Sequence, residues 1–259
     1  MKITYANQTI DLFDKNTFPN GPPNKIIVSL SGGLDSASLM YLIATHFPKI
    51  EIYPFNSKDE DGPLDTKSAI KIHKFLQNKF PDGKINDLEL FDVKTSDPKW
   101  IKIAQEAMDS PKGKIIINGK TETIWRTVKG ASKAIQCRHI RINLTKKYNT
   151  VVATGMSQNP PIKEMKELGF YDVAERKRDP DKTSNLSFMD GITYTPYIFV
   201  DKKFVADIYI KNNLMEELYP LTKSCAWGIS DGNINYPDPC GKCFWCNEKK
   251  WAFNRKNYD

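Results

Sequence analysis

Short apolar runs rich in β-branched residues alternate along the chain with longer segments whose apolar residues recur at helical spacing. The first kind predicts buried strands, which are residues 25–30, 51–55, 87–93, 114–118 and 151–155, although 114–118 also suits the lead into a helix. The second kind predicts helices, which are residues 35–47, 64–80, 99–108 and 122–148, the last with a break expected at Gly130. This alternation predicts an α/β fold, doubly wound around a mostly parallel sheet that binds ligands beyond the carboxyl ends of its strands.

Regular patterning weakens on both sides of this region. Proline and glycine mark residues 16–24 as a loop, and the charged residues 175–185 predict a loop or lid. The remaining pattern predicts an extended segment at residues 192–200 and helices at residues 163–170, 202–212, 213–218 and 247–257. We therefore expect two domains, residues 1–200 with the sheet and residues 201–259 as a C-terminal helical region.

The composition suits a soluble globular protein, because 40% of the 259 residues are hydrophobic and 27% are charged. No stretch has the about 18 apolar residues that span a membrane, and the opening MKITYANQTI lacks the apolar core of a secretory signal. We therefore expect a cytoplasmic protein without a membrane partner. The net charge of +7 suits nucleotides, nucleic acids or acidic substrates, although a surface that is merely lysine-rich stays open.

The segment Ser31–Ser36, with the sequence SGGLDS, lies between a predicted strand and a predicted helix. Gly32 and Gly33 let the backbone approach an anion closely, and the amides at a helix N-terminus point toward such a ligand. The hydroxyls of Ser31 and Ser36 add donors, while Asp35 suits Mg²⁺ or the support of the loop. The alternative is an ordinary turn in which Asp35 or Ser36 caps the helix. The pattern of a Walker-type loop is absent.

Four of the five cysteines, Cys225, Cys240, Cys243 and Cys246, fall within the last 35 residues. In a reducing compartment such clustering favours metal binding over disulfides. Four thiolates suit tetrahedral Zn²⁺ and also an iron–sulfur cluster, and a full set of four ligands indicates a structural role. The fifth, Cys137, stands alone in a predicted helix and suits a small core residue.

The SGGLDS loop after an apolar strand resembles the PP-loop of the ATP pyrophosphatase superfamily. The C-terminal motifs add a more specific resemblance, because they occur in the order seen in 7-cyano-7-deazaguanine synthases. These motifs are Thr195-Pro196, Asp201-Lys202, Thr222-x-Ser224-Cys225, Cys240-Gly241-Lys242-Cys243-x₂-Cys246 and Ala252-Phe253. The likeness covers residues 25–55 and 192–253.

This resemblance implies an adenine nucleotide alpha hydrolase-like fold with ATP, Mg²⁺ and Zn²⁺ as cofactors. It implies a ligase of queuosine biosynthesis that adenylates 7-carboxy-7-deazaguanine, releases pyrophosphate and AMP, and forms the 7-cyano product with ammonia. Lys202 and Asp35 would be catalytic, and Cys225, Cys240, Cys243 and Cys246 would bind zinc. The nucleotide would contact Ser31, Gly32, Gly33, Leu34, Asp35, Ser36, Phe55 and Gly155.

Three positions depart from that family. Phe204 replaces a glutamate, Pro54-Phe55-Asn56 replaces a tyrosine-glycine-glutamine run, and no Tyr-Pro-Asp follows residues 151–155. Other reactions therefore stay open: adenylation of another acid or of a nucleic-acid- or protein-bound group, sulfur transfer or reduction in the manner of phosphoadenylylsulfate reductases, and nucleotide binding without catalysis.

Residues 122–148 carry seven lysines and arginines, which suit either a polymeric anion or a solvated face. Trp125 suits either base stacking or the core. A nucleic-acid partner and a homodimer stay open.

Overall fold

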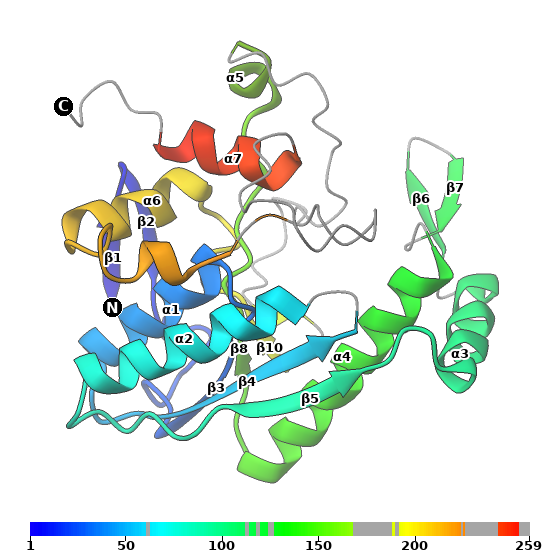
Figure 1. Cartoon of the computed structure of the whole chain (residues 1–259), viewed down its shortest axis with the longest axis horizontal. Helices are drawn as coiled ribbons and strands as arrows, with labels where there is room; N and C mark the ends of the chain where they lie inside the picture. Colours follow the sequence, from blue (N-terminus) through cyan, green and yellow to red (C-terminus); the bar gives the residue numbers. More distant parts are fainter. Residues whose placement is uncertain are drawn as a thin grey trace.

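The computed structural model describes residues 1–60, 63–111, 114–117, 120–123, 127–167, 188–189, 192–223, 225 and 243–253. Its centre is a six-stranded sheet of order β5-β4-β3-β8-β10-β9 (Figure 1). The strands are β3 (Lys25–Ser29), β4 (Glu51–Asp59), β5 (Glu89–Val93), β8 (Val152–Ala153), β9 (Phe188–Met189) and β10 (Thr193–Tyr194). All neighbouring pairs are parallel except β9 with β10. The predicted α/β class with a mostly parallel sheet is therefore confirmed.

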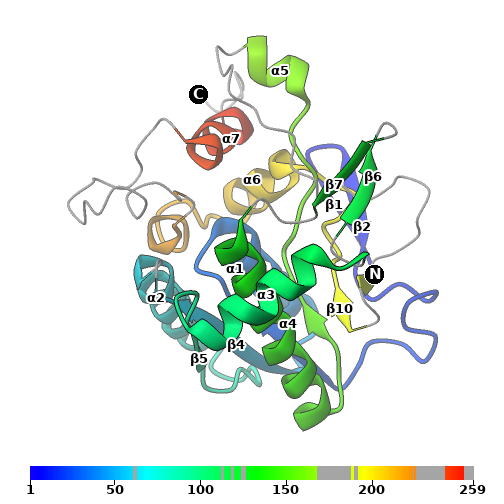
Figure 2. The same cartoon turned by 90° about the vertical axis from the view of Figure 1, so that its right-hand side faces the viewer.

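Helices cover both faces of the sheet, as the alternation of side chains along β3 requires. Ile26 and Val28 pack into the main core with α1 (Leu34–His46) and α2 (Pro63–Lys79). Ile27, between them, points to the opposite face and packs with Leu144 of α4 (Val128–Tyr148). The helix α3 (Pro98–Asp109) lies against α4 (Figure 2). The sheet is therefore doubly wound.

The expected helix over residues 122–148 is wrong in its first part. Residues Lys114–Ile117 and Lys120–Thr123 form the antiparallel strands β6 and β7, and α4 begins only at Val128. The expected break at Gly130 is also wrong, because Gly130 lies in the first turn of α4. Its amide donates to Oγ1 of the N-cap Thr127 at 3.0 Å, which fixes the start of the helix there.

The C-terminal elements follow the prediction more closely. The helix α6 (Lys202–Lys211) ends one residue before the predicted boundary, and α5 (Ile162–Glu167) begins one residue before the predicted short helix and ends three residues before its predicted end. The helix α7 (Phe244–Phe253) begins three residues earlier than predicted. Of the predicted extended segment, only Thr193–Tyr194 is a strand. The predicted lid at residues 175–185 lies outside the described residues.

A helix over residues 213–218 does not form. Asn213 takes a left-handed conformation with φ of 55°, and its amide donates to the carbonyl of Ile210 at 3.3 Å. The next amide, of Leu214, donates to the carbonyl of Tyr209 at 2.8 Å. These two bonds form a Schellman motif, which ends α6 and sends the chain into turns before the short 3₁₀ helix Tyr219–Leu221.

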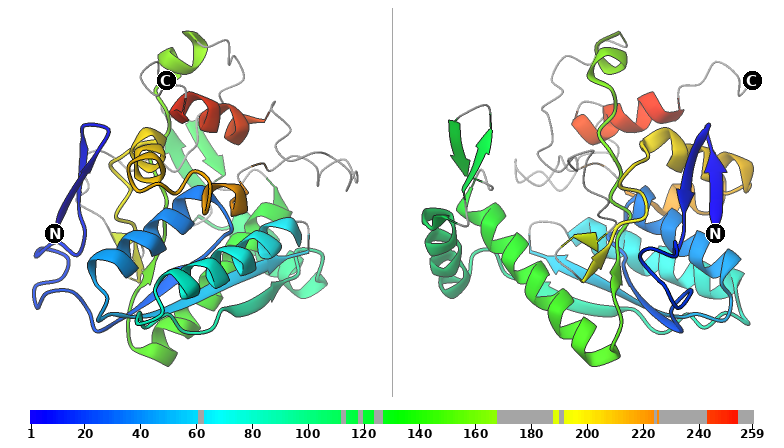
Figure 3. Two further views of the ribbon diagram at one scale, coloured as in Figure 1. Left: turned by 60° about the vertical axis from the view of Figure 1, so that its left-hand side comes forward. Right: turned by 180° about the vertical axis from the view of Figure 1, so that it is seen from behind.

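An N-terminal hairpin, which the pattern analysis did not predict, packs beside α6 (Figure 3). Its strands are β1 (Lys2–Tyr5) and β2 (Gln8–Asp11). The amide of Ala6 in its turn donates to Oδ2 of Asp207 at 2.5 Å. The hairpin and α1 thus both pack against α6. The division into two domains at residue 200 stays a prediction. No helix in the described part of the chain is long and apolar enough to cross a membrane.

Candidate functional site

The SGGLDS loop lies at the carboxyl end of the central strand β3, in the position that the sequence predicts. Gly32 has φ of +86°, and a Cβ there would lie 2.3 Å from the carbonyl oxygen of Asp65. Only glycine fits this position without a backbone shift. Gly33 is the N-cap of α1 and offers no side chain to the first amides of the helix. The helix N-terminus therefore presents its amides to a ligand beyond the strand.

The two serines of the loop have different surroundings. Oγ of Ser36 is buried, accepts from the amide of Ser31 at 3.2 Å and donates to the carbonyl of Gly33 at 3.1 Å. Ser31 is exposed, and its Oγ lies 3.1 Å from Oγ of Ser36. Ser36 therefore maintains the shape of the loop, while Ser31 is accessible to a ligand.

Three other predicted contact residues are buried around the loop. Leu34 is in the main core and Phe55 packs between the sheet and α4, so each can offer only backbone atoms to a nucleotide. A Cβ on Gly155 would lie 2.5 Å from the carbonyl carbon and oxygen of Asp35. Gly155, two residues after β8, therefore lets the chain pack directly against the first turn of α1.

A buried charge cluster joins the loop to two other helices. Lys202, the first residue of α6, makes an ion pair with Oδ2 of Asp35, and its Nζ lies 3.7 Å from Oε2 of Glu248 on α7. The side chains of Lys202 and Glu248 are only 7% and 1% exposed. Oδ1 of Asp35 is buried and has no hydrogen-bond partner within the described ranges. Two carboxylates facing one ammonium, with this oxygen unused, suit an added cation.

Glu248 was missed from the sequence, although helical spacing contains its signal. Phe244, Glu248, Trp251 and Ala252 recur on one face of α7, and the last three are buried. An acid at a core position of a helix requires charge compensation nearby. A search for charged residues on apolar faces would therefore have selected Glu248.

The hydroxyl of a buried tyrosine supports the same part of the fold. Tyr209 on α6 donates to the carbonyl of Leu34 in the first turn of α1 at 3.0 Å. Burial raises the pKa of Tyr209 well above its usual value of 10.0, so the phenol stays neutral and able to donate. This bond ties α6, and with it Lys202, to the loop.

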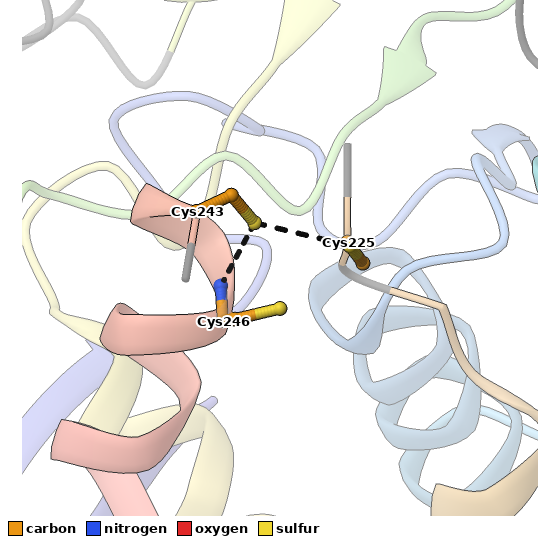
Figure 4. Close-up of side chains that lie close together, drawn as sticks. All are labelled: Cys225, Cys243 and Cys246. Atoms are coloured by element: carbon orange, nitrogen blue, oxygen red, sulfur yellow. Dashed lines mark hydrogen bonds between the residues drawn. The ribbon is translucent and has the colours of Figure 1, made fainter. Parts of the chain in front are cut away.

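Three of the four predicted metal ligands come together (Figure 4). The sulfurs of Cys225, Cys243 and Cys246 lie within 4.8 Å of one another, and all three residues are buried. The Sγ atoms of Cys225 and Cys243 are 3.9 Å apart. Tetrahedral zinc with Zn–S bonds of about 2.3 Å places its sulfurs about 3.8 Å apart, so the group could hold a metal ion of this kind. Cys240 lies outside the described residues.

The cysteine group adjoins the SGGLDS loop, which the sequence did not indicate. The amide of Lys223 donates to the carbonyl of Gly32 at 2.8 Å, and Lys223 is buried. Cys225 follows two residues later, so one short segment contacts the loop and supplies a ligand. Cys137, in contrast, lies on α4, with no place in the cysteine group as far as the described residues show.

The basic residues of α4 are partly used within the fold. Lys133 pairs with Asp59 at 2.5 Å, and Lys147 pairs with Glu89 at 2.9 Å. Burial acts to lower the pKa of Lys133, but the hydrogen bond and the charge of Asp59 raise it overall. Trp125, a candidate for base stacking, lies outside the described residues.

No protein-family model matches the sequence, and no curated protein matches it either. Among solved structures, the fold is similar to the U34-tRNA thiolase NcsA from Methanococcus maripaludis, determined with its [4Fe-4S] cluster. The identity is 13%, the match covers 88% of this chain and 69% of that one, and the TM-score is 0.40. A likeness at this level assigns neither a family nor a reaction.

Proposed function

We propose that this chain is an ATP-using PP-loop enzyme that adenylates a carboxylate and replaces AMP with ammonia. The observation that carries the proposal is the glycine loop after β3, which leads into the open N-terminus of α1 with Lys202 and Asp35 beside it. This combination suits the outer phosphates of a nucleotide. The order of the C-terminal motifs supports 7-carboxy-7-deazaguanine as the acid and 7-cyano-7-deazaguanine as the product.

In this proposal the residues bind and orient rather than react covalently. The first amides of α1 and the hydroxyl of Ser31 hold the β- and γ-phosphates, so that the α-phosphorus faces the substrate. Lys202 neutralises charge that develops as pyrophosphate leaves. Mg²⁺, for which Oδ1 of Asp35 is the available ligand, would supply further neutralisation of the phosphates.

The chemistry is two successive dehydrations. A carboxylate oxygen attacks the α-phosphorus and pyrophosphate leaves, and then ammonia attacks the acyl carbon and AMP leaves with that oxygen, giving the amide. The amide oxygen takes a second adenylyl group in the same way. Loss of AMP and of the two nitrogen-bound protons then gives the nitrile.

For the cysteines we propose zinc, with Cys240 as the fourth ligand. The sulfur spacing of 3.9 Å supports a single metal ion. In a [4Fe–4S] cluster each cysteine binds a different iron, so the cysteine sulfurs lie farther apart. With four thiolates the zinc would have no open position and would support the C-terminal region.

A second candidate is a PP-loop sulfur-transfer enzyme. The bond between Lys223 and Gly32 favours it, because it holds the segment that leads to Cys225 against the loop. Metal analysis separates the two candidates: iron with acid-labile sulfide supports sulfur transfer, and zinc supports the ligase.

Turnover tests the ligase directly. The protein is incubated with Mg·ATP, 7-carboxy-7-deazaguanine and ammonium, and the products are read by mass spectrometry. We expect the nitrile together with AMP and pyrophosphate, and no nitrile from Asp35→Asn. AMP formation with another acid alone would exclude the deazaguanine substrate, and no AMP with any acid would exclude the ligase.

A further inference from the structure

Glu248 is the most deeply buried carboxylate near the candidate nucleotide site. Its side chain is 1% exposed, and it approaches Nζ of Lys202 at 3.7 Å. Moving a carboxylate out of water costs several kcal/mol unless an opposite charge compensates it. Glu248 also belongs to α7, the helix that includes Cys246 and directly follows Cys243.

Lys202 is held in place from its other side as well. The preceding residue, Asp201, is the N-cap of α6. The side chain of Gln8 donates to Oδ1 of Asp201 at 2.7 Å and accepts from its amide at 2.9 Å. The N-terminal hairpin thus fixes the backbone at Lys202, and Asp35 and Glu248 both contact its ammonium.

The acidic side chain of α6, Asp207, is used elsewhere, because it pairs with Lys211 and accepts a hydrogen bond from the amide of Ala6. Phe204, two residues after Lys202, is fully buried against the rings of Tyr5 and Tyr197, each with a centroid 5.5 Å away. A carboxylate there would lie in the apolar core. The second carboxylate at Lys202 therefore comes from α7, across the site.

We propose that Glu248 is a positioning residue that holds Lys202 for the nucleotide and ties the cysteine-bearing helix to the phosphate loop. The proposal rests on the proposed function, in which Lys202 contacts the phosphates. Asp35 and an arriving phosphate compete for the same ammonium. Glu248, fixed on α7, shares the ammonium with Asp35, so that Lys202 is less firmly held by the loop and can turn to the phosphates.

The charge of Glu248 alone would have the opposite effect. A buried negative charge beside an anion site repels ATP, so removing it would strengthen binding if only the field mattered. If Glu248 positions Lys202, the loss of Glu248 leaves the ammonium of Lys202 more firmly held by Asp35. ATP then binds more weakly, because Lys202 turns to the phosphates less readily. The sign of the change therefore separates the two roles.

The test measures Mg·ATP binding by isothermal titration calorimetry on the metal-loaded full chain. We expect Glu248→Gln to weaken binding about tenfold, the usual effect of losing one contact to a charged group. Glu248→Asp should recover part of the loss, and Glu216→Gln, at an exposed position, should match the wild type. Lys202→Gln should weaken binding at least as much, and adding Glu248→Gln to it should change nothing further.

Several results would overturn the proposal. These are tighter or unchanged binding by Glu248→Gln, an additional loss in the double variant, or loss of metal from Glu248→Gln without recovery in Glu248→Asp. The last would make Glu248 a structural part of the cysteine group. Absence of ATP binding by the wild type is a separate result, which would remove the proposed function and this inference with it.

Discussion

Replacement of Gly155 by alanine tests how the SGGLDS loop is held. Gly155 is buried two residues after β8, and its added Cβ would lie 2.5 Å from the carbonyl atoms of Asp35 and 2.8 Å from the amide nitrogen of Ser36. Ordinary van der Waals contact begins near 3.4 Å, so the two backbone segments must separate by about 3.4 − 2.5 = 0.9 Å. Both partners are backbone, and no flexible side chain can move aside. The strain therefore falls on the first turn of α1.

The size of the effect follows from this displacement. Overpacking of this kind costs about 1–3 kcal/mol in the free energy of unfolding. For a chain of this size each kcal/mol lowers Tm by roughly 2–4 °C. A shift of about 1 Å in a group that positions the reacting phosphates lowers the reaction rate by up to about 100-fold. We expect Gly155→Ala to stay folded, to melt several degrees lower and to bind Mg·ATP at least tenfold more weakly.

Gly21→Ala is the matched control. Gly21 also has a positive φ, of 86°, but a Cβ there would meet nothing within 4 Å. Alanine in this conformation lowers the free energy of unfolding by about 1–2 kcal/mol and leaves the SGGLDS loop in place. Thermal melts and calorimetry on both variants give the result. Normal ATP affinity in Gly155→Ala, or an equal loss of affinity in Gly21→Ala, would refute the reasoning.

Three further predictions concern the metal, acid stability and the N-terminal hairpin. Cys225→Ser should lose the bound metal and Cys137→Ser should keep it, as measured by plasma mass spectrometry; equal metal in both would contradict the assigned ligands. The hydrogen bond from Lys203 lowers the pKa of Glu164 below 4.5. The ionised Glu164 therefore stabilises the fold fully above pH 4.5, and this contribution is lost as the pH falls through the lowered pKa of the folded state. Because this side chain is 44% exposed, Glu164→Gln should lower stability at pH 7 by less than about 1 kcal/mol and have no effect near pH 2, and an equal effect at both would refute the linkage. Ala6 has φ of 50°, so Ala6→Gly should stabilise the chain by about 0.5–1 kcal/mol in urea unfolding; destabilisation would argue against the left-handed turn.

Local signals predicted the elements that hold the loop. The β-branched run at β3, the glycines after it and the helical spacing beyond them place the loop without further information. The hairpin of β6 and β7 was predictable too, because the Asn-Gly pair at residues 118–119 favours a hairpin over a helix. The turn at Ala6 and Asn7 lacks glycine, so its left-handed conformation gave no comparable signal.

Long-range contacts account for what the sequence could not predict. Cysteine spacing indicated that Cys225, Cys243 and Cys246 converge, yet nothing local placed them next to the loop. That proximity depends on a backbone bond between Lys223 and Gly32, which any residue type could form. Likewise, the pairing of Lys202 with Glu248 depends on how α6 and α7 pack, and no motif contains both residues.

The central claim is that the loop Ser31–Ser36 binds the outer phosphates of ATP. Calorimetric titration with Mg·ATP, AMP and Mg·pyrophosphate tests it most directly, because the three ligands differ in the groups that the loop would hold. We predict that ATP binds, that pyrophosphate competes with it, and that AMP binds at least tenfold more weakly than ATP. Equal affinity for AMP and ATP, or no competition by pyrophosphate, would contradict the account.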